Sequence, residues 1–427
     1  MSSFRNAIAG FLAELEGLHF SLPVIMHKIE ETHKEAVGKL ESYLEAHNNS
    51  KLEEEVTDKR GTRTVTRYEI DVEHHFALGT LQSGSVRLTA ASVIIPRSFV
   101  IALVSQFDAF LGRLLRAVYA NRPEILNASE RNLTFANLIE FNSIDEAREY
   151  VLEKEIEAVL RESHTEHFDY LERKLGIELR KGLDIWPTFI EVTERRNLFV
   201  HTDGVVSTQY IAVCKKHKVN LILGEKVGQV LEADPGYLNT TYNCLYEIAV
   251  KLSQVLWRKL LPGELEEADI YLTMVCYELL KREEYTLTGR LLDFALTLPR
   301  HSSQRFKLVS TVNRAIAHKW GGDKSKCNKM LDETDWSASA MDFQLSVAVL
   351  KDDFELARDL MRKLGLSELV EKAGYKDWPV FRDFRRTRIF LETYREIFGQ
   401  SLEIIEVTED DTITIVEADK STVEPEN

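Results

Sequence analysis

Apolar residues recur three or four positions apart along most of this chain, as Phe4, Ile8, Phe11 and Leu15 do near its start. This spacing places side chains on one face of an α-helix. Residues that end helices are scarce, because the 427-residue sequence contains only nine prolines and twenty glycines. The sequence therefore predicts a mainly α fold, and its length exceeds what a single hydrophobic core usually serves.

Changes in pattern divide the chain into four expected regions. Residues 1–94 are expected to form an N-terminal accessory region, and residues 95–262 a helical bundle. Residues 263–400 are expected to form an array of short paired helices. Residues 401–427 are expected to form a β-hairpin, with strands from Ser401 and Thr412, followed by a disordered acidic tail.

In the accessory region, helices are expected over residues 3–18 and about 24–47, the second beginning at Pro23. Residues 62–72 alternate between β-branched or aromatic and charged side chains, a pattern typical of a strand. The apolar run 86–95 is expected to complete a small sheet. The pattern assigns no chemistry to this region.

Four helices are expected in the bundle. The first begins at Ile95-Pro96-Arg97, with proline at a permitted first-turn position, and ends before Pro123. The other three are expected over residues 145–175, 187–201 and 235–261. Each helix has an apolar stripe that must be buried against another element, which favours a four-helix bundle.

The helices after residue 262 are shorter and occur in pairs. Tyr285 and Phe354 occupy equivalent places in two such pairs, separated by about two periods of roughly 34 residues, the length of a tetratricopeptide repeat. A tetratricopeptide-like array is therefore predicted. The alternative is a set of irregular helices that extend the bundle.

The net charge of −15 argues against broad, nonspecific adhesion to nucleic acid. A local basic cluster, Lys215, Lys216 and Lys218, is the candidate RNA-binding surface, and a solvated basic face is the alternative. The chain shows no signal-peptide pattern, and no stretch approaches the roughly 18 to 20 uncharged apolar residues of a membrane span, so a cytoplasmic location without a membrane is expected. The four widely spaced cysteines are expected to be free.

The run from Glu194 to His201 ends the third helix of the expected bundle. His201 lies in the last turn, where the helix dipole favours a protonated imidazole suited to proton transfer. Arg196 is permanently charged and suits charge that develops on a phosphoryl group. Asn197, four positions before His201, shares its face of the helix. Taken alone, an arginine and a histidine at a helix end are most often a salt-bridging residue and a cap.

This run resembles the active-site signature of HEPN-superfamily ribonucleases, in which an arginine, a polar residue, three further residues and a histidine end a long helix of a helical bundle. Arg196, Asn197 and His201 match that pattern, and the resemblance covers less than half of the chain. It implies metal-independent RNA cleavage that leaves a 2',3'-cyclic phosphate and a 5'-hydroxyl, with Arg196 and His201 catalytic and no cofactor or metal. Glu194 and Arg195 are adjacent candidates for supporting roles, or surface ions.

The resemblance also implies a homodimer that pools two such pairs in one cleft. Related latent ribonucleases act in bacterial toxin, abortive-infection and antiphage-defence systems, and the helical array would then be a sensor or a docking surface for a protein partner. Members that are inactivated by adenylylation carry a tyrosine two positions after the histidine, where this chain has Asp203.

Two alternatives remain open at this stage. The first is a noncatalytic scaffold that binds a nucleotide or protein partner and signals through its helical array. The second is a zinc hydrolase that uses His164 and His167, three positions apart on one helix.

Overall fold

The computed structural model describes residues 3–58, 61–127, 133–221, 224–399, 404–407 and 413–416. The fold is mainly α, as predicted. The chain divides into two compact units, Met1–Leu256 and Trp257–Asn427.

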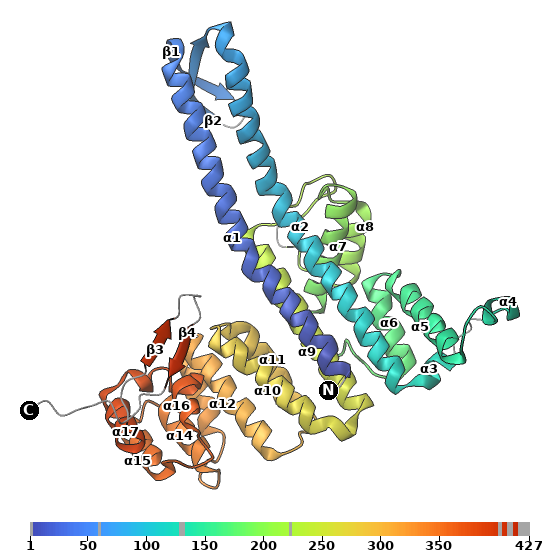
Figure 1. Ribbon diagram of the computed structural model, residues 1–427, viewed down its shortest axis with the longest axis vertical. Coiled ribbons are helices and arrows are strands. Elements are labelled where there is room, and N and C mark those ends of the chain that lie inside the picture. Colours follow the sequence, from blue (N-terminus) through green and yellow to red (C-terminus); the bar gives the residue numbers. More distant parts are fainter. Residues whose placement is uncertain are drawn as a thin grey trace, which may run out of the picture. The chain divides into compact units, whose positions relative to one another are not determined.

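The first unit contains a long antiparallel pair of helices, α1 (Ser3–Ala46) and α2 (His75–Asn121), that pack side by side (Figure 1). The hairpin of β1 (Asn48–Asp58) and β2 (Gly61–Ile70) connects their far ends, followed by a short 3₁₀ turn, η1 (Val72–His74). We call these elements together the arm.

Two predictions in the accessory region are wrong. α1 runs through Pro23, so the two helices expected over residues 3–18 and 24–47 are one helix. α2 runs through Pro96, so the expected helix start at Ile95 and the expected boundary after residue 94 fall inside α2. Each proline removes one backbone hydrogen bond, at a cost of about 3 kcal/mol. The packing of α1 on α2, which buries Leu22 and Pro96, offsets that cost.

The small sheet also differs from the prediction. The strand expected over residues 62–72 is present as β2, but it pairs with β1, from Asn48↔Ile70 to Asp58↔Gly61. Residues 86–95 are helical. A short apolar run fits a strand and a buried helix about equally well, which explains the error.

Several of the remaining helices of the first unit begin at a serine or threonine cap. The helix expected over residues 145–175 is two helices, because Ser163 and Glu166 form a capping box that starts a new one. The helices expected over 187–201 and 235–261 are confirmed. In order, the elements are α3 (Pro123–Asn127), α4 (Phe135–Leu138), α5 (Ile144–Leu160), α6 (His164–Leu175), α7 (Trp186–His201), α8 (Thr208–Lys216) and α9 (Pro235–Leu260).

The second unit continues from α9 with short helices, many of them packed on the next one along the chain. They are η2 (Pro262–Glu264), α10 (Leu265–Lys281), α11 (Tyr285–Thr297), α12 (Gln304–Trp320), α13 (Lys324–Asp332), α14 (Met341–Leu350), α15 (Phe354–Leu364), α16 (Lys372–Asp377), η3 (Pro379–Phe381), η4 (Phe384–Arg386) and α17 (Arg388–Phe398). The predicted C-terminal hairpin is present as β3 (Ile404–Val407) and β4 (Ile413–Val416). The predicted disordered tail lies outside the described residues.

Tyr285 and Phe354, which the sequence pattern makes equivalent, each begin a helix after the same turn. Glu283 and Asp352 both have a φ of 62°. The next amide in each turn donates to the carbonyl five residues back, 3.0 Å away, from Glu284 to Leu279 and from Asp353 to Ala348. These two helix pairs therefore share one local geometry.

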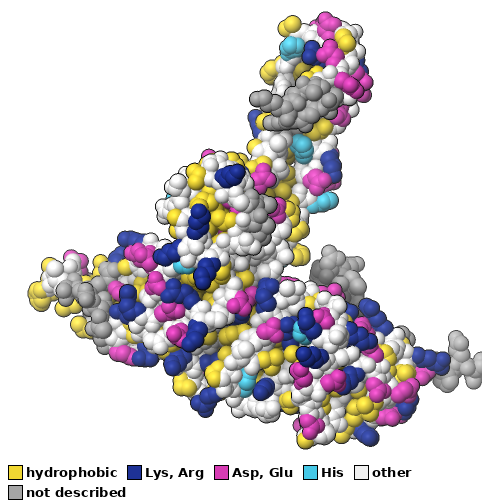
Figure 2. Space-filling model, turned by 180° about the vertical axis from the view of Figure 1, so that it is seen from behind, with side chains coloured by type: hydrophobic (Ala, Val, Ile, Leu, Met, Phe, Trp, Pro, Cys, Tyr) yellow, Lys and Arg dark blue, Asp and Glu magenta, His cyan; other side chains and the backbone are white. Residues whose placement is uncertain are grey.

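Two helical segments, Ser3–Ala46 and Val72–Asn121, are long and apolar enough to cross a membrane by length and composition alone. Only 28% and 22% of their most apolar windows are buried. Large hydrophobic side chains are exposed on the arm, among them Phe20 and Phe76. Figure 2 shows hydrophobic and charged side chains interspersed on one face of the arm. The four cysteines are free and buried, as expected for unpaired thiols.

Candidate functional site

Helix α7 carries the motif and ends where the sequence predicts. The backbone N–H groups of Thr202 and Gly204 both donate to the Leu198 carbonyl, at 2.9 and 3.1 Å. Gly204 has a φ of 83°, and a Cβ atom there would lie 2.8 Å from the Leu231 carbonyl oxygen. Only glycine fits this position without strain, so the helix stops directly after His201.

Arg196 faces α2, where it lies beside Asp108. Its Nη2 is 3.5 Å from Asp108 Oδ2, and its Nη1 donates to Asn197 Oδ1 at 3.2 Å. The other carboxylate oxygen of Asp108 lies 2.8 Å from His164 Nε2. We call Asp108, His164 and Arg196 the Asp108 cluster. It joins α2, α6 and α7 in a partly buried setting.

The guanidinium of Arg196 keeps capacity for a further ligand. Its contact with Asp108 is an ion pair that is longer than a hydrogen bond, and its Nε has no partner among the described residues. An arginine has five N–H donors, and one is engaged here in a hydrogen bond, to Asn197. The Arg196 side chain is 24% exposed, so its guanidinium is partly accessible and keeps N–H donors that are not engaged in a hydrogen bond.

Glu194 and His167 lie close to the Asp108 cluster in a desolvated environment. Burial raises the pKa of Glu194, although the charge of His164 opposes that rise. Burial, and then the charge of His164, lower the pKa of His167 to about 4. His167 is 1% exposed, and both of its ring nitrogens are buried.

The geometry does not favour zinc coordination by His164 and His167. Their ring centroids are 5.2 Å apart, and His164 Nε2 is directed at Asp108. Within the described residues, no group of three or more histidine, cysteine, aspartate or glutamate side chains is placed to hold a metal ion.

Arg195 belongs to a different network from its neighbour Arg196. Its Nε donates to Glu191 at 2.6 Å, and its guanidinium lies 3.9 Å from the centroid of the Tyr237 ring. Glu191 is buried and also accepts hydrogen bonds from the hydroxyls of Tyr210 and Tyr237, at 2.8 and 3.0 Å. Burial alone would lower the pKa of Arg195. The electrostatic interactions with Tyr237 and Glu191 outweigh burial, so the pKa of Arg195 is raised. These contacts hold α7 against α8 and α9.

The imidazole of His201 is exposed and has no hydrogen bond or ion pair to another described residue. Lys215, Lys216 and Lys218 are also exposed, but they lie near the opposite end of α7. Trp186, the first residue of α7, donates through Nε1 to His217 Nδ1 at 3.3 Å. Since α7 rises about 1.5 Å per residue, the lysines lie roughly 20 Å along the helix from His201. The structure therefore separates the two parts of the predicted site.

Asp108 was not among the site residues predicted from the sequence, and His164 was predicted only as a candidate zinc ligand. A signal for Asp108 was present, because it is an acidic residue within an apolar helical stripe that contains Phe107 and Phe110. Such a residue needs a buried partner. Its partner comes from α6 and α7, which only the tertiary fold brings together.

No known protein family, curated protein or solved structure matches this chain. The likeness to HEPN ribonucleases therefore rests on the motif and its helical setting.

Proposed function

We propose that the protein is a metal-independent endoribonuclease in which Arg196 and His201 act on one phosphodiester of RNA. The observation that carries the proposal is the end of α7, where an exposed histidine follows a partly exposed arginine that has donors to spare. The helical bundle around α7 is then of HEPN type, and the reaction needs no cofactor.

The proposed reaction uses the nucleophile that RNA already contains. The 2'-hydroxyl oxygen attacks phosphorus while its proton passes to a neutral imidazole, and the bond from phosphorus to the 5'-oxygen breaks. The same imidazole, now protonated, gives that proton to the leaving oxygen, and the products are a 2',3'-cyclic phosphate and a 5'-hydroxyl. Arg196 stabilises the additional charge on the phosphoryl oxygens.

A dimer supplies the required geometry. An α-helix turns about 100° per residue, so side chains five positions apart leave the helix about 140° apart. Arg196 and His201 of one chain therefore do not share a face, whereas Asn197 and His201 do. Two α7 helices that face each other allow Arg196 of one protomer to meet His201 of its partner.

The second unit is proposed to be a tetratricopeptide-like array that senses an activator or docks a protein partner. The matching turns before Tyr285 and Phe354 support a repeated helix pair. A cytoplasmic toxin or antiphage-defence role agrees with such an arrangement, in which cleavage waits for a signal received by the array.

The test is RNA cleavage by His201→Ala and Arg196→Ala, with product ends analysed for cyclic phosphate. Matched controls are His75→Ala and Arg148→Ala, which remove an exposed histidine and an exposed arginine elsewhere in the first unit. We expect both motif variants to lose at least about 100-fold in rate and both controls to retain it. Equal cleavage by wild type and motif variants would refute the proposal.

One observation favours a second candidate, the noncatalytic scaffold. Arg196 already has an ion-pair partner in Asp108 and a hydrogen-bond partner in Asn197, as a purely structural arginine does. On this alternative, Arg196→Ala lowers stability, His201→Ala changes nothing, and neither chain cleaves RNA under any condition.

A further inference from the structure

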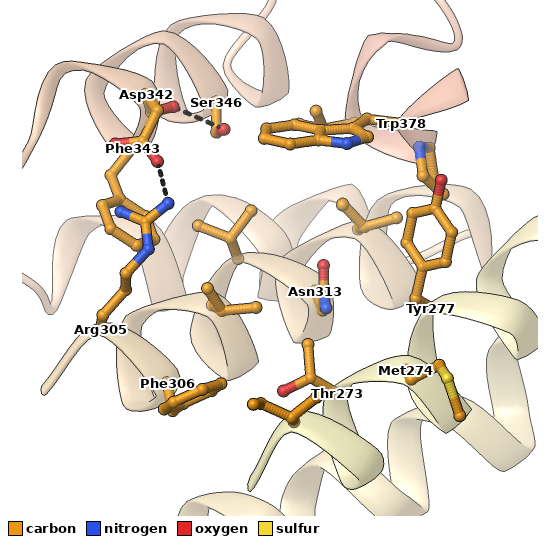
Figure 3. Close-up of a pocket in the computed structure, with 16 residues that line it drawn as sticks. Thr273, Met274, Tyr277, Arg305, Phe306, Asn313, Asp342, Phe343, Ser346 and Trp378 are labelled. Carbon is orange, nitrogen blue, oxygen red and sulfur yellow. Dashed lines mark hydrogen bonds and ion pairs between the residues drawn. The ribbon is translucent and has the colours of Figure 1, made fainter. Parts of the chain in front are cut away.

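The second unit contains a cavity of about 360 Å³ between α10, α12, α14 and the segment Trp378–Val380 (Figure 3). This volume is within the range of sites that hold small organic molecules. All of its walls belong to one unit, and the cavity shares no residue with α7.

Aromatic side chains dominate the two sides of the cavity. Figure 3 shows Phe306 and Phe343 on one side, and Trp378 and Tyr277 on the other. Aliphatic residues of α12 line the floor between them. A flat apolar ring placed here would contact aromatic side chains on either side.

The indole of Trp378 is held in place as a wall. A Cβ atom at Gly374 would lie 2.8 Å from Trp378 Cε2, so only glycine allows the ring to pack this closely. Arg385 Nη1 donates to the Trp378 carbonyl at 2.8 Å, and the indole lies nearly parallel to the Phe381 ring, at an interplanar angle of 4°. The wall is therefore preorganised, which reduces the entropy lost on binding.

The arginine that lines the cavity is already engaged. Arg305 Nη2 donates to Asp342 Oδ2 at 2.7 Å, and its guanidinium lies 5.0 Å from the centroid of the Phe343 ring. Asp342 is buried, and its Oδ1 has no partner among the described residues. The positive charge of Arg305 is therefore neutralised, and the carboxylate is only partly satisfied.

An adjoining hollow makes the approach to the cavity acidic. It shares Tyr277, Arg305 and Trp378 with the cavity, and Glu368, Glu371 and Asp377 also line it. The two glutamates are exposed, whereas the charge of Asp377 acts on Arg385. Among the described residues that line the cavity and the hollow, the only cation is Arg305, which is paired with Asp342, so an anionic ligand would be repelled by these carboxylates.

We propose that this cavity binds a planar aromatic molecule that carries a protonated amino group. The ring lies between the aromatic walls, and the ammonium group lies in the acidic hollow beside Glu368 and Glu371. Because those carboxylates repel phosphate, a nucleotide is disfavoured at this site. The inference is independent of RNA cleavage by α7.

The test is calorimetric titration of the full-length protein with three indoles that share a two-carbon linker and differ in the charge of the terminal group: the cationic tryptamine, the neutral tryptophol and the anionic indole-3-propionate. We expect tryptamine to bind at least about tenfold more tightly than indole-3-propionate, with tryptophol between them. Absence of tryptamine binding at millimolar concentration, or equal binding of the three, would overturn the proposal.

Variants locate the site. Trp378→Ala should weaken tryptamine binding about tenfold or more, and the double change Glu368→Gln with Glu371→Gln should remove the preference for tryptamine over tryptophol. Met274→Lys adds a cation at a part-exposed wall residue and should also weaken tryptamine, without disturbing the core. Leu356→Lys, at an exposed position of α15, and Glu333→Gln are the matched controls. Unchanged affinity in both Trp378→Ala and Met274→Lys would place the ligand elsewhere.

Discussion

His167 is 1% exposed, and burial favours the neutral form of its imidazole in the folded core. Its pKa is lowered from 6.5 to about 4, first by burial and then by His164. The unfolded chain therefore binds more protons than the folded chain between these two values.

The contribution of His167 to stability should fall as pH drops below about 6.5 and level off near pH 4, a loss of up to about 3 kcal/mol. The measurement is the free energy of unfolding by urea at pH 7.5 and pH 5, for wild type and His167→Leu. Leucine has no titrating group, so the variant should lose less stability between these pH values. An identical loss in both proteins would contradict the assignment.

Arg195 should matter for stability more than for chemistry. Arg195→Met leaves Glu191 buried without its cation, and we expect a loss of about 3–5 kcal/mol in the free energy of unfolding. Arg148→Met, at an exposed position, is the control and should change stability by less than about 0.5 kcal/mol. A stable Arg195→Met protein that has lost RNA cleavage would instead give Arg195 a direct role.

At the scale of elements, the end of α7 depends on Gly204. Gly204→Ala forces a side chain into a left-handed conformation against the Leu231 carbonyl, and we expect a loss of about 1–3 kcal/mol by thermal or urea unfolding. Gly182 also has a positive φ but has open space around it. Gly182→Ala therefore measures the cost of the backbone conformation alone, without a steric contact. Gly204→Ala should cost clearly more than Gly182→Ala, and equal losses would show that contact with Leu231 is unimportant.

Elements with a clear local signal were predictable. Pro187 and Gly204 mark the two ends of α7, and the alternating pattern marks β2. The continuity of α2 through Pro96 was not predictable, because a proline within a helical pattern usually marks a helix boundary. Only the packing of α2 on α1 makes the longer helix stable. The functional site follows the same rule: its local motif could be recognised in the sequence, whereas its tertiary contacts could not.

Arg196 and His201 stand out by type and spacing, whereas the contact of Arg196 with Asp108 joins helices far apart in sequence. No local pattern encodes that pairing. The separation of His201 from Lys215 was missed for a similar reason, since short distance in sequence suggested a common surface. The packing of α8 beside α7 decides which end of α7 the lysines approach.

At the scale of the whole molecule, the proposed shared cleft makes a prediction about mixed protomers. Arg196→Ala and His201→Ala chains are each inactive alone, but coexpression should restore up to about half of the cleavage rate of a wild-type dimer. In the mixed dimer, one of two composite centres regains both groups. The measurement is cleavage by heterodimers purified through two different tags. No recovery would show that both groups act within one chain.

The arm has a consequence for the dynamics of the first unit. No described residue of α1 after Leu22, or of α2 before Pro96, is buried, so the outer half of the arm is held mainly by partial contacts between two helices and the β1–β2 hairpin. Its amides should exchange with deuterium through local opening, at a lower free energy than global unfolding. Peptides from residues 26–46 should therefore take up deuterium sooner than peptides from residues 98–118. The order of deuterium uptake along the arm would then run from its tip toward its base, where the amides keep their protons longest.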